Sequence, residues 1–82
     1  MEHENNLNDV IRALQSIKPG VEFRGEDDLL GRHILESLEI MMLVAELNDT
    51  FGITITLPYI KPDNFRSAET ICAMVEDVLD EG

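Results

Sequence analysis

Two side chains whose chemistry could be covalent lie four residues apart near the middle of the chain. His33 and Ser37 form a close imidazole and hydroxyl pair, the combination that a general base and a nucleophile require. The rest of a catalytic site is absent, and 82 residues with a mostly aliphatic composition leave little room for a substrate pocket and an oxyanion site. The sequence therefore gives hydrolysis little support, and we expect neither catalytic residues nor an enzyme.

Ser37 has a second role open to it because it stands where a long loop meets an amphipathic helix. Serine at such a place commonly caps the helix, although Ile40, rather than Glu or Gln, three residues later does not complete a capping box. The alternative is covalent attachment of a phosphate-linked group, since a helix start offers unpaired N–H groups and the positive end of the helix dipole. Local sequence favours neither role over the other.

One cysteine and two acidic groups are the remaining candidates for chemistry. Cys72 has no Lys or Arg within a helical turn and no nearby histidine to lower its pKa, so we expect a partly buried structural residue. The acidic groups, Glu26–Asp28 and the set Asp77, Asp80 and Glu81, lack the ligand spacing of a calcium loop. Solvated charge, with no metal bound, is the expectation for both.

The charge balance limits the partners that the chain can have. Seventeen acidic and six basic residues give a formal net charge of -11, which repels phosphate backbones and anionic membranes. We expect no binding to nucleic acid and no membrane insertion, and we expect protein partners with basic patches. The single cysteine and the lack of signal-peptide features predict a cytoplasmic protein. The length of 82 residues predicts one domain over residues 1–82, and we expect a monomer.

Three amphipathic segments predict the helices that must position these residues. The first runs from Leu7 to Ile17, with Asn5 or Asn6 as its cap and Lys18–Gly20 as its end. Residues 19–36 show no period and predict a long loop that its apolar residues pin to the core.

The second helix is predicted from Ser37 to Phe51, with Gly52 ending it. Its core face is apolar, but so is much of the side where water would be expected. Methionine suits surfaces that must fit several shapes, so this extra apolar surface predicts either more core or a contact patch, with Met41 at the boundary between the two. The residues concerned are Leu38, Met41, Met42 and Ala45.

The last third of the chain completes an all-α prediction. Phe51–Leu57 alternates with period two, but without a second strand we expect an extended linker anchored by Ile53 and Ile55. Lys61–Phe65 can hold at most one helical turn, and Ser67 can cap a last helix. The predicted fold is a small four-helix bundle, three main helices plus one short one, with a long loop between the first and second helices.

The segment Ile-Leu-Glu-Ser-Leu-Glu-Ile-Met at residues 34–41 resembles the attachment motif of acyl carrier proteins, usually written Asp-Ser-Leu. The resemblance covers nearly the whole chain, including the loop with Asp28–Leu30, the helix ending Leu47–Ile53 and the last helix opened by Phe65–Ser67. Glu36 stands where that family has aspartate, which keeps the charge but adds a methylene. We therefore expect weakened attachment, or the need for a particular transferase.

The resemblance implies that Ser37 receives 4'-phosphopantetheine from coenzyme A through a phosphopantetheinyl transferase. The thiol of that arm would hold an acyl or aminoacyl group as a thioester and deliver it to partners, namely a loading ligase and downstream synthase or transferase enzymes. The chain would then be a carrier and not a catalyst, and its core could open to shelter an apolar chain. The implied partner surface comprises Glu36, Leu38, Glu39, Met41, Met42, Ala45, Glu46 and Asp49.

The cargo and one rival function stay open. The residues from Phe51 to Phe65 are similar both to D-alanyl and other aminoacyl carriers and to free-standing polyketide or fatty-acid carriers, and we favour a discrete carrier outside the main fatty-acid pathway. The rival is an unmodified acidic interaction module, such as a nucleic-acid mimic. Its charge would suit that role, but a mimic has no use for a long loop that ends at a serine beside an apolar patch.

Overall fold

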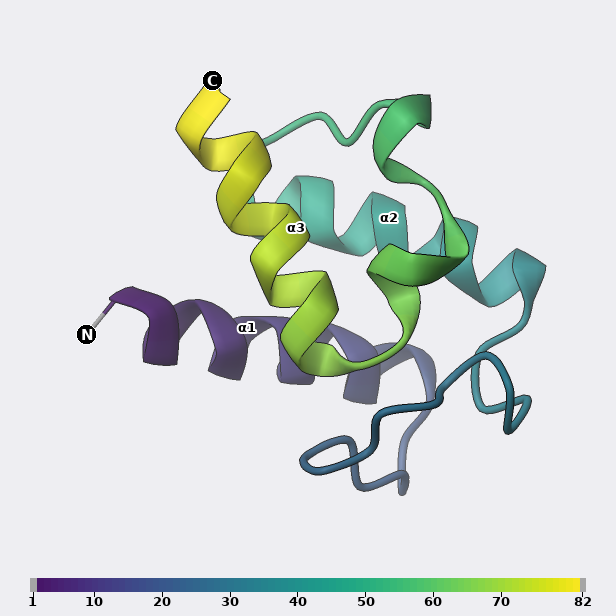
Figure 1. Cartoon of the computed structure of the whole chain (residues 1–82). Helices are drawn as coiled ribbons and strands as arrows, with labels where there is room; N and C mark the ends of the chain where they lie inside the picture. The colour runs from purple at the N-terminus through teal and green to yellow at the C-terminus, as the bar shows by residue number, and fades with distance from the viewer. Residues whose placement is uncertain (1, 82) are drawn as a thin grey trace.

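The computed structural model describes residues 2–81, and every regular element among them is helical (Figure 1). The all-α prediction is confirmed, and the extended segment after the second helix pairs with no other strand within these residues. None of the described helices is both long and apolar enough to cross a membrane. In chain order the elements are α1 (Glu2–Ile17), α2 (Ser37–Phe51), the 3-10 turns η1 (Leu57–Tyr59) and η2 (Pro62–Phe65), and α3 (Ala68–Glu81).

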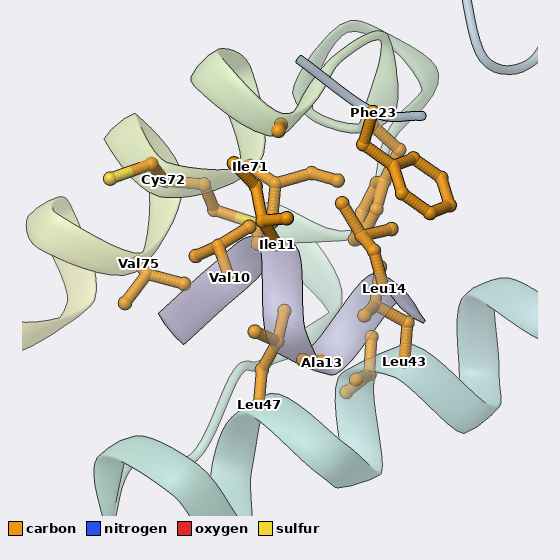
Figure 2. Packing of buried hydrophobic residues seen from close by; sticks show 14 of the residues in the cluster. Val10, Ile11, Ala13, Leu14, Phe23, Leu43, Leu47, Ile71, Cys72 and Val75 are labelled. Carbon is orange, nitrogen blue, oxygen red and sulfur yellow. The ribbon is translucent and has the colours of Figure 1, made fainter. Parts of the chain in front are cut away.

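One helix organises the packing. The first helix, α1, contacts both α2 and α3, while η2 packs on α3 (Figure 1). Figure 2 shows side chains from all three α-helices meeting in one core. Most of that core is aliphatic, as the composition predicts, but its two largest fully buried side chains are aromatic: Phe23 from the loop and Phe65 from η2.

The first helix begins earlier than its apolar pattern predicts. Asn5 and Asn6 lie inside α1 and do not cap it, so that prediction is wrong. The apolar spacing starts only where α1 meets the core, and it cannot register a polar turn that extends beyond the core. Asn6 instead donates a hydrogen bond from Nδ2 to the Glu76 carboxylate of α3 at 3.2 Å. The predicted end is confirmed, since the helix stops at Ile17 and Gly20 follows with a φ of 88°.

The loop over residues 18–36 is fixed to the core, as predicted. Phe23, Leu29 and Leu35 are each at most 2% exposed. The Leu29 amide donates to the Arg66 carbonyl at 2.8 Å, which ties the middle of the loop to the segment just before α3. These buried side chains and this hydrogen bond help to determine where α2 can begin.

The segment after α2 is the predicted extended linker. Gly52 ends the helix in the left-handed region, with a φ of 64°. Ile55 is buried and Ile53 is half-buried, so both anchor the linker, whereas Leu57 is 81% exposed because the 3-10 turn that starts there directs it outward.

The predicted cap of the last helix is confirmed. The Thr70 amide donates to Ser67 Oγ at 3.1 Å, and the Ser67 amide donates to Thr70 Oγ1 at the same distance. This reciprocal pair satisfies two backbone donors at the start of α3, which would otherwise lack partners at a buried position. Ser67 is therefore a structural residue.

Candidate functional site

The start of α2 is capped by the residue before the serine. Glu36 has the extended N-cap conformation, with a φ of -118° and a ψ of 170°, and Ser37 is the first helical residue. The Glu36 amide donates to the Glu39 carboxylate at 3.0 Å, which is the return bond of a capping box. The capping role considered for Ser37 is therefore wrong: the box runs from Glu36 to Glu39, and the spacing of those two residues was the overlooked signal.

Because the N-cap lies at Glu36, one residue earlier, the Ser37 hydroxyl is not used for capping. Ser37 is exposed, and among residues 2–81 its side chain has no hydrogen-bond partner. Its own amide and that of Leu38 lie in the first turn of α2, where backbone N–H groups have no acceptor within the helix. The hydroxyl therefore stands in solvent at the positive end of a 15-residue helix.

A salt bridge joins the end of α1 to the start of α2. Lys18 Nζ lies 3.1 Å from a Glu39 carboxylate oxygen, and the two side chains are only 32% and 21% exposed. Glu39 thus serves the cap and the ion pair at once. The resemblance implies that Glu39 meets partner proteins, but in this structure its carboxylate is engaged inside the molecule, and Lys18 is a site residue that the sequence patterns did not single out.

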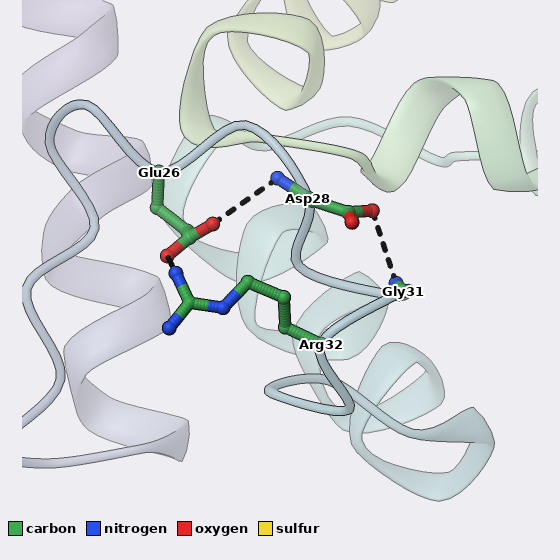
Figure 3. Close-up of polar contacts among 4 residues, drawn as sticks. All are labelled: Glu26, Asp28, Gly31 and Arg32. Atoms are coloured by element: carbon green, nitrogen blue, oxygen red, sulfur yellow. Dashed lines mark hydrogen bonds and ion pairs between the residues drawn. The ribbon is translucent and has the colours of Figure 1, made fainter.

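The loop before Ser37 is held by a small polar network (Figure 3). Arg32 contacts the Glu26 carboxylate at 2.6 Å, the same carboxylate accepts from the Asp28 amide at 3.3 Å, and Asp28 in turn accepts from the Gly31 amide at 3.2 Å. The Glu26 side chain is only 13% exposed, so the prediction of solvated charge is wrong for this residue. Its carboxylate organises the loop.

The last residues before the site are fixed by one carbonyl. Leu29 accepts hydrogen bonds from the amides of Ile34 and Leu35, at 2.9 and 3.1 Å. Leu35 is buried, so the chain enters α2 from a fixed point two residues before Ser37. The backbone that presents the hydroxyl is therefore pinned on the loop side as well as on the helix side.

His33 is close to Ser37 in sequence, but the structure does not connect the two side chains. No hydrogen bond joins them in the part of the chain that the structure describes. His33 is exposed and has a φ of 58°, an uncommon conformation for a residue with a Cβ. It forms part of the tight turn that precedes Leu35.

An exposed apolar stripe leads away from Ser37 along α2. Leu38, Met41 and Met42 are 73%, 52% and 47% exposed, and Ala45 is also exposed. Their spacing of three, four and seven residues places them on one face of the helix. The opposite face of α2 supplies Leu43, Val44 and Leu47 to the core. We call the four exposed residues the α2 stripe, and Met41 belongs to it and not to the core.

The predicted partner charges lie at the two ends of this stripe. Glu36 is exposed beside Ser37, whereas Glu46 and Asp49 follow Met42 and Ala45 by four residues each. Asp49 is exposed and Glu46 is half-buried. The structure therefore brings together a serine, an apolar stripe and acidic ends on a single helix.

Cys72 lies apart from this site, in the core. It is fully buried, more so than predicted, and desolvation raises the pKa of its thiol to about 11, with smaller contributions from the carboxylates of Glu76 and Glu69. Such a thiol stays protonated and unreactive at neutral pH. No group of three or more side chains suited to a metal ion occurs among residues 2–81.

Comparison with known proteins gives no relative for this arrangement. No family model matches the chain, and no curated protein and no solved structure matches it.

Proposed function

We propose that the chain is a carrier of the acyl carrier protein type, which bears 4'-phosphopantetheine on Ser37. The observation that carries the proposal is the exposed Ser37 hydroxyl at the first turn of α2, released from capping by Glu36 and standing at the end of an exposed apolar stripe. The resemblance of residues 34–41 to a carrier attachment motif supports the same function. In this proposal η2 is the short fourth helix of a carrier bundle.

The residues around Ser37 suit a phosphodiester. The positive helix end and the amides of the first turn favour an anion there. Lys18 neutralises much of the charge of Glu39, which leaves Glu36 as the nearest carboxylate in sequence that opposes a phosphate. Attachment would transfer the phosphopantetheinyl group of coenzyme A to Ser37 Oγ, with release of adenosine 3',5'-bisphosphate and of the hydroxyl proton.

The chain itself would bind and present, while partner enzymes do the chemistry. The arm would supply a thiol that holds an acyl or aminoacyl group as a thioester. The α2 stripe would contact the transferase, the loading ligase and the downstream enzymes in turn, and the adaptable side chains of Met41 and Met42 suit several partners. Basic patches on those enzymes would be attracted by the net charge of -11.

Intact-mass measurement tests the proposal. We expect the wild-type chain, incubated with coenzyme A and a broadly specific phosphopantetheinyl transferase, to gain the mass of one phosphopantetheinyl group. The matched variants are Ser37→Ala, which should gain nothing, and Ser16→Ala, which removes an exposed serine of α1 and should gain as wild type does. An unmodified wild type, or an equal gain in Ser37→Ala, would favour the acidic interaction module instead.

A further inference from the structure

Residues 53–56, which we call the connector, take no part in the proposed carrier function. They alternate isoleucine and threonine, belong to no helix or turn, and run as an open segment near the C-terminal end of α3 (Figure 1). Thr56 has an extended backbone, with a φ of -92° and a ψ of 166°. Ile55 is buried, whereas Thr54 and Thr56 are exposed. The connector thus has the pattern of a strand, but within residues 2–81 no other strand pairs with it.

On one edge of the connector the amides are bonded inward; on the other edge the amides are open, although the Thr56 carbonyl accepts a hydrogen bond from the Tyr59 amide at 2.9 Å. Ile53 donates its amide to the Asn48 carbonyl at 3.1 Å, and Ile55 donates its amide to Asn48 Oδ1 at 2.9 Å. Alternate residues of an extended backbone direct their amides to the same side, so the amides of Thr54 and Thr56 face away from Asn48. In the described part of the chain neither of these two amides has an acceptor.

A groove of about 460 Å³ borders the connector. Its opposite wall comes from Tyr59 and from the last turns of α3, with Val78, Leu79 and Glu81. Leu79 is 40% exposed, and the Glu81 carboxylate accepts a hydrogen bond from the Tyr59 hydroxyl. The groove therefore combines an apolar wall, an acidic end and a backbone edge with two open amides.

We propose that the connector and this groove bind an extended peptide segment of a partner protein, one that alternates apolar and basic side chains. Such a segment would add a second strand: its carbonyls would accept from the amides of Thr54 and Thr56, and its apolar side chains would lie in the groove. Its basic side chains would be attracted by Glu81, which lines the groove, and by Asp77, whose charge also acts on Tyr59. Charge disfavours a second copy of this chain as the occupant, because two molecules of net charge -11 repel each other.

The probe for this site is a capped Val-Lys-Val-Lys-Val-Lys peptide, titrated into the full chain and followed by amide NMR shifts. We expect shifts confined to residues 53–59 and 78–81. The matched control peptide carries N-methyl groups on alternate residues, so its side chains and charge are unchanged. The methyl groups remove backbone N–H donors of the peptide and block its close approach to the connector, both of which strand addition needs. We expect it to bind at least about fivefold more weakly.

A pair of variants tests the same edge from the side of the protein. Thr56→Pro removes an amide that has no internal acceptor, at a φ that proline nearly matches, while Thr56→Val keeps the amide and loses only the hydroxyl. We expect Thr56→Pro to weaken binding about fivefold and Thr56→Val to bind as wild type does. If Thr56→Pro does not fold, the N-methylated peptide decides alone.

Three results would overturn the proposal: equal binding of the two peptides, shifts centred on α2, or connector shifts that depend on protein concentration without peptide, which would assign the edge to a second copy. Ser37→Ala should bind the peptide as wild type does. The connector site can therefore fail while the carrier function holds, and the reverse.

Discussion

At the scale of single residues, Glu36 and Ser37 divide two tasks between them. Glu36 ends the loop and caps α2, so the adjacent Ser37 hydroxyl has no structural role among the described residues. Ser67, at the start of α3, is the contrasting case, because its hydroxyl accepts from the Thr70 amide and is buried. The two serines look alike in sequence, and only the position of the cap separates them.

This contrast predicts different effects on stability. Ser37→Ala should change the free energy of unfolding by no more than about 0.5 kcal/mol, because an exposed, unbonded hydroxyl is lost. Ser67→Ala should cost about 1 kcal/mol, the usual effect of losing an N-cap. Urea denaturation of the unmodified proteins checks both values. A loss in Ser37→Ala as large as that in Ser67→Ala would show that Ser37 has a structural role.

Under the proposed carrier function, removing the extra methylene of Glu36 should make Ser37 a better substrate for the transferase. Glu36→Asp should keep the cap, since aspartate is a good N-cap residue, and should restore the usual attachment motif. We expect the rate of phosphopantetheinyl transfer to rise by about tenfold, because small misplacements at a reacting group are costly. Asp80→Glu, the reverse exchange at an exposed position of α3, is the control and should leave the rate unchanged. An unchanged rate in Glu36→Asp would mean that the transferase does not distinguish the two carboxylates.

The burial of Cys72 predicts how its thiol will react with a maleimide reagent. Burial raises its pKa to about 11 from an ordinary value near 9, so in the native protein at pH 7 it should resist a maleimide reagent. After modification the reagent should label one thiol, that of the arm. Because the unfolded chain loses this proton first, the stability that the buried thiol contributes should fall as pH rises from about 9 towards 11. Labelling of the native unmodified chain at pH 7 would contradict this assignment.

At the scale of elements, Glu39 links the start of α2 to the end of α1. Glu39→Gln keeps a cap acceptor but loses the Lys18 ion pair, and should cost up to about 1 kcal/mol because both side chains are partly exposed. Glu39→Ala loses both interactions and should cost about 1 to 2 kcal/mol. Glu46→Gln, on the same helix, is the matched control. Urea denaturation checks these values. Equal free energies of unfolding for Glu39→Ala and Glu46→Gln would show that Glu39 does not help to hold the start of α2.

The helices and linkers could be predicted from the sequence because periodicity and breakers record them directly. The apolar spacing of α2 and α3, the stop at Gly20, the Gly52 end and the Ser67 cap each depend on nearby residues. The start of α1 could not, because polar residues beyond the core leave no apolar pattern. Capping by Glu36 was missed since the serine beside it is the commoner cap, and the Glu26 network depends on how the loop folds back on itself.

At the scale of the whole molecule, the net charge of -11 should affect stability and association in opposite directions. Salt screens self-repulsion, so the melting temperature should rise between about 0.05 and 0.5 M NaCl. The rate of modification by a transferase with a basic surface should fall over the same range. Asp27→Asn, which removes one exposed charge, should lessen both slopes. A melting temperature that falls with salt would mean that ion pairs such as Lys18 with Glu39 outweigh the repulsion.

The composition could predict this charge and its effect on partners, but not where the acidic side chains point. Among the residues assigned to partners, Glu36 and Asp49 are exposed, Glu46 is half-buried and Glu39 is turned inward to Lys18. That difference arises from tertiary contact between α1 and α2, which residue spacing within one helix does not record. The α2 stripe could be predicted because it depends on that spacing alone.

The most direct test of the carrier function is to locate the added group after the transferase reaction. Trypsin should release a peptide that begins at His33, in which Ser37 is the single serine. If Ser37 carries the arm, this peptide gains the mass of one phosphopantetheinyl group, and its fragment ions assign the gain to Ser37. An unmodified peptide under conditions that fully convert a known carrier, or a gain located on any other residue, would contradict attachment at Ser37.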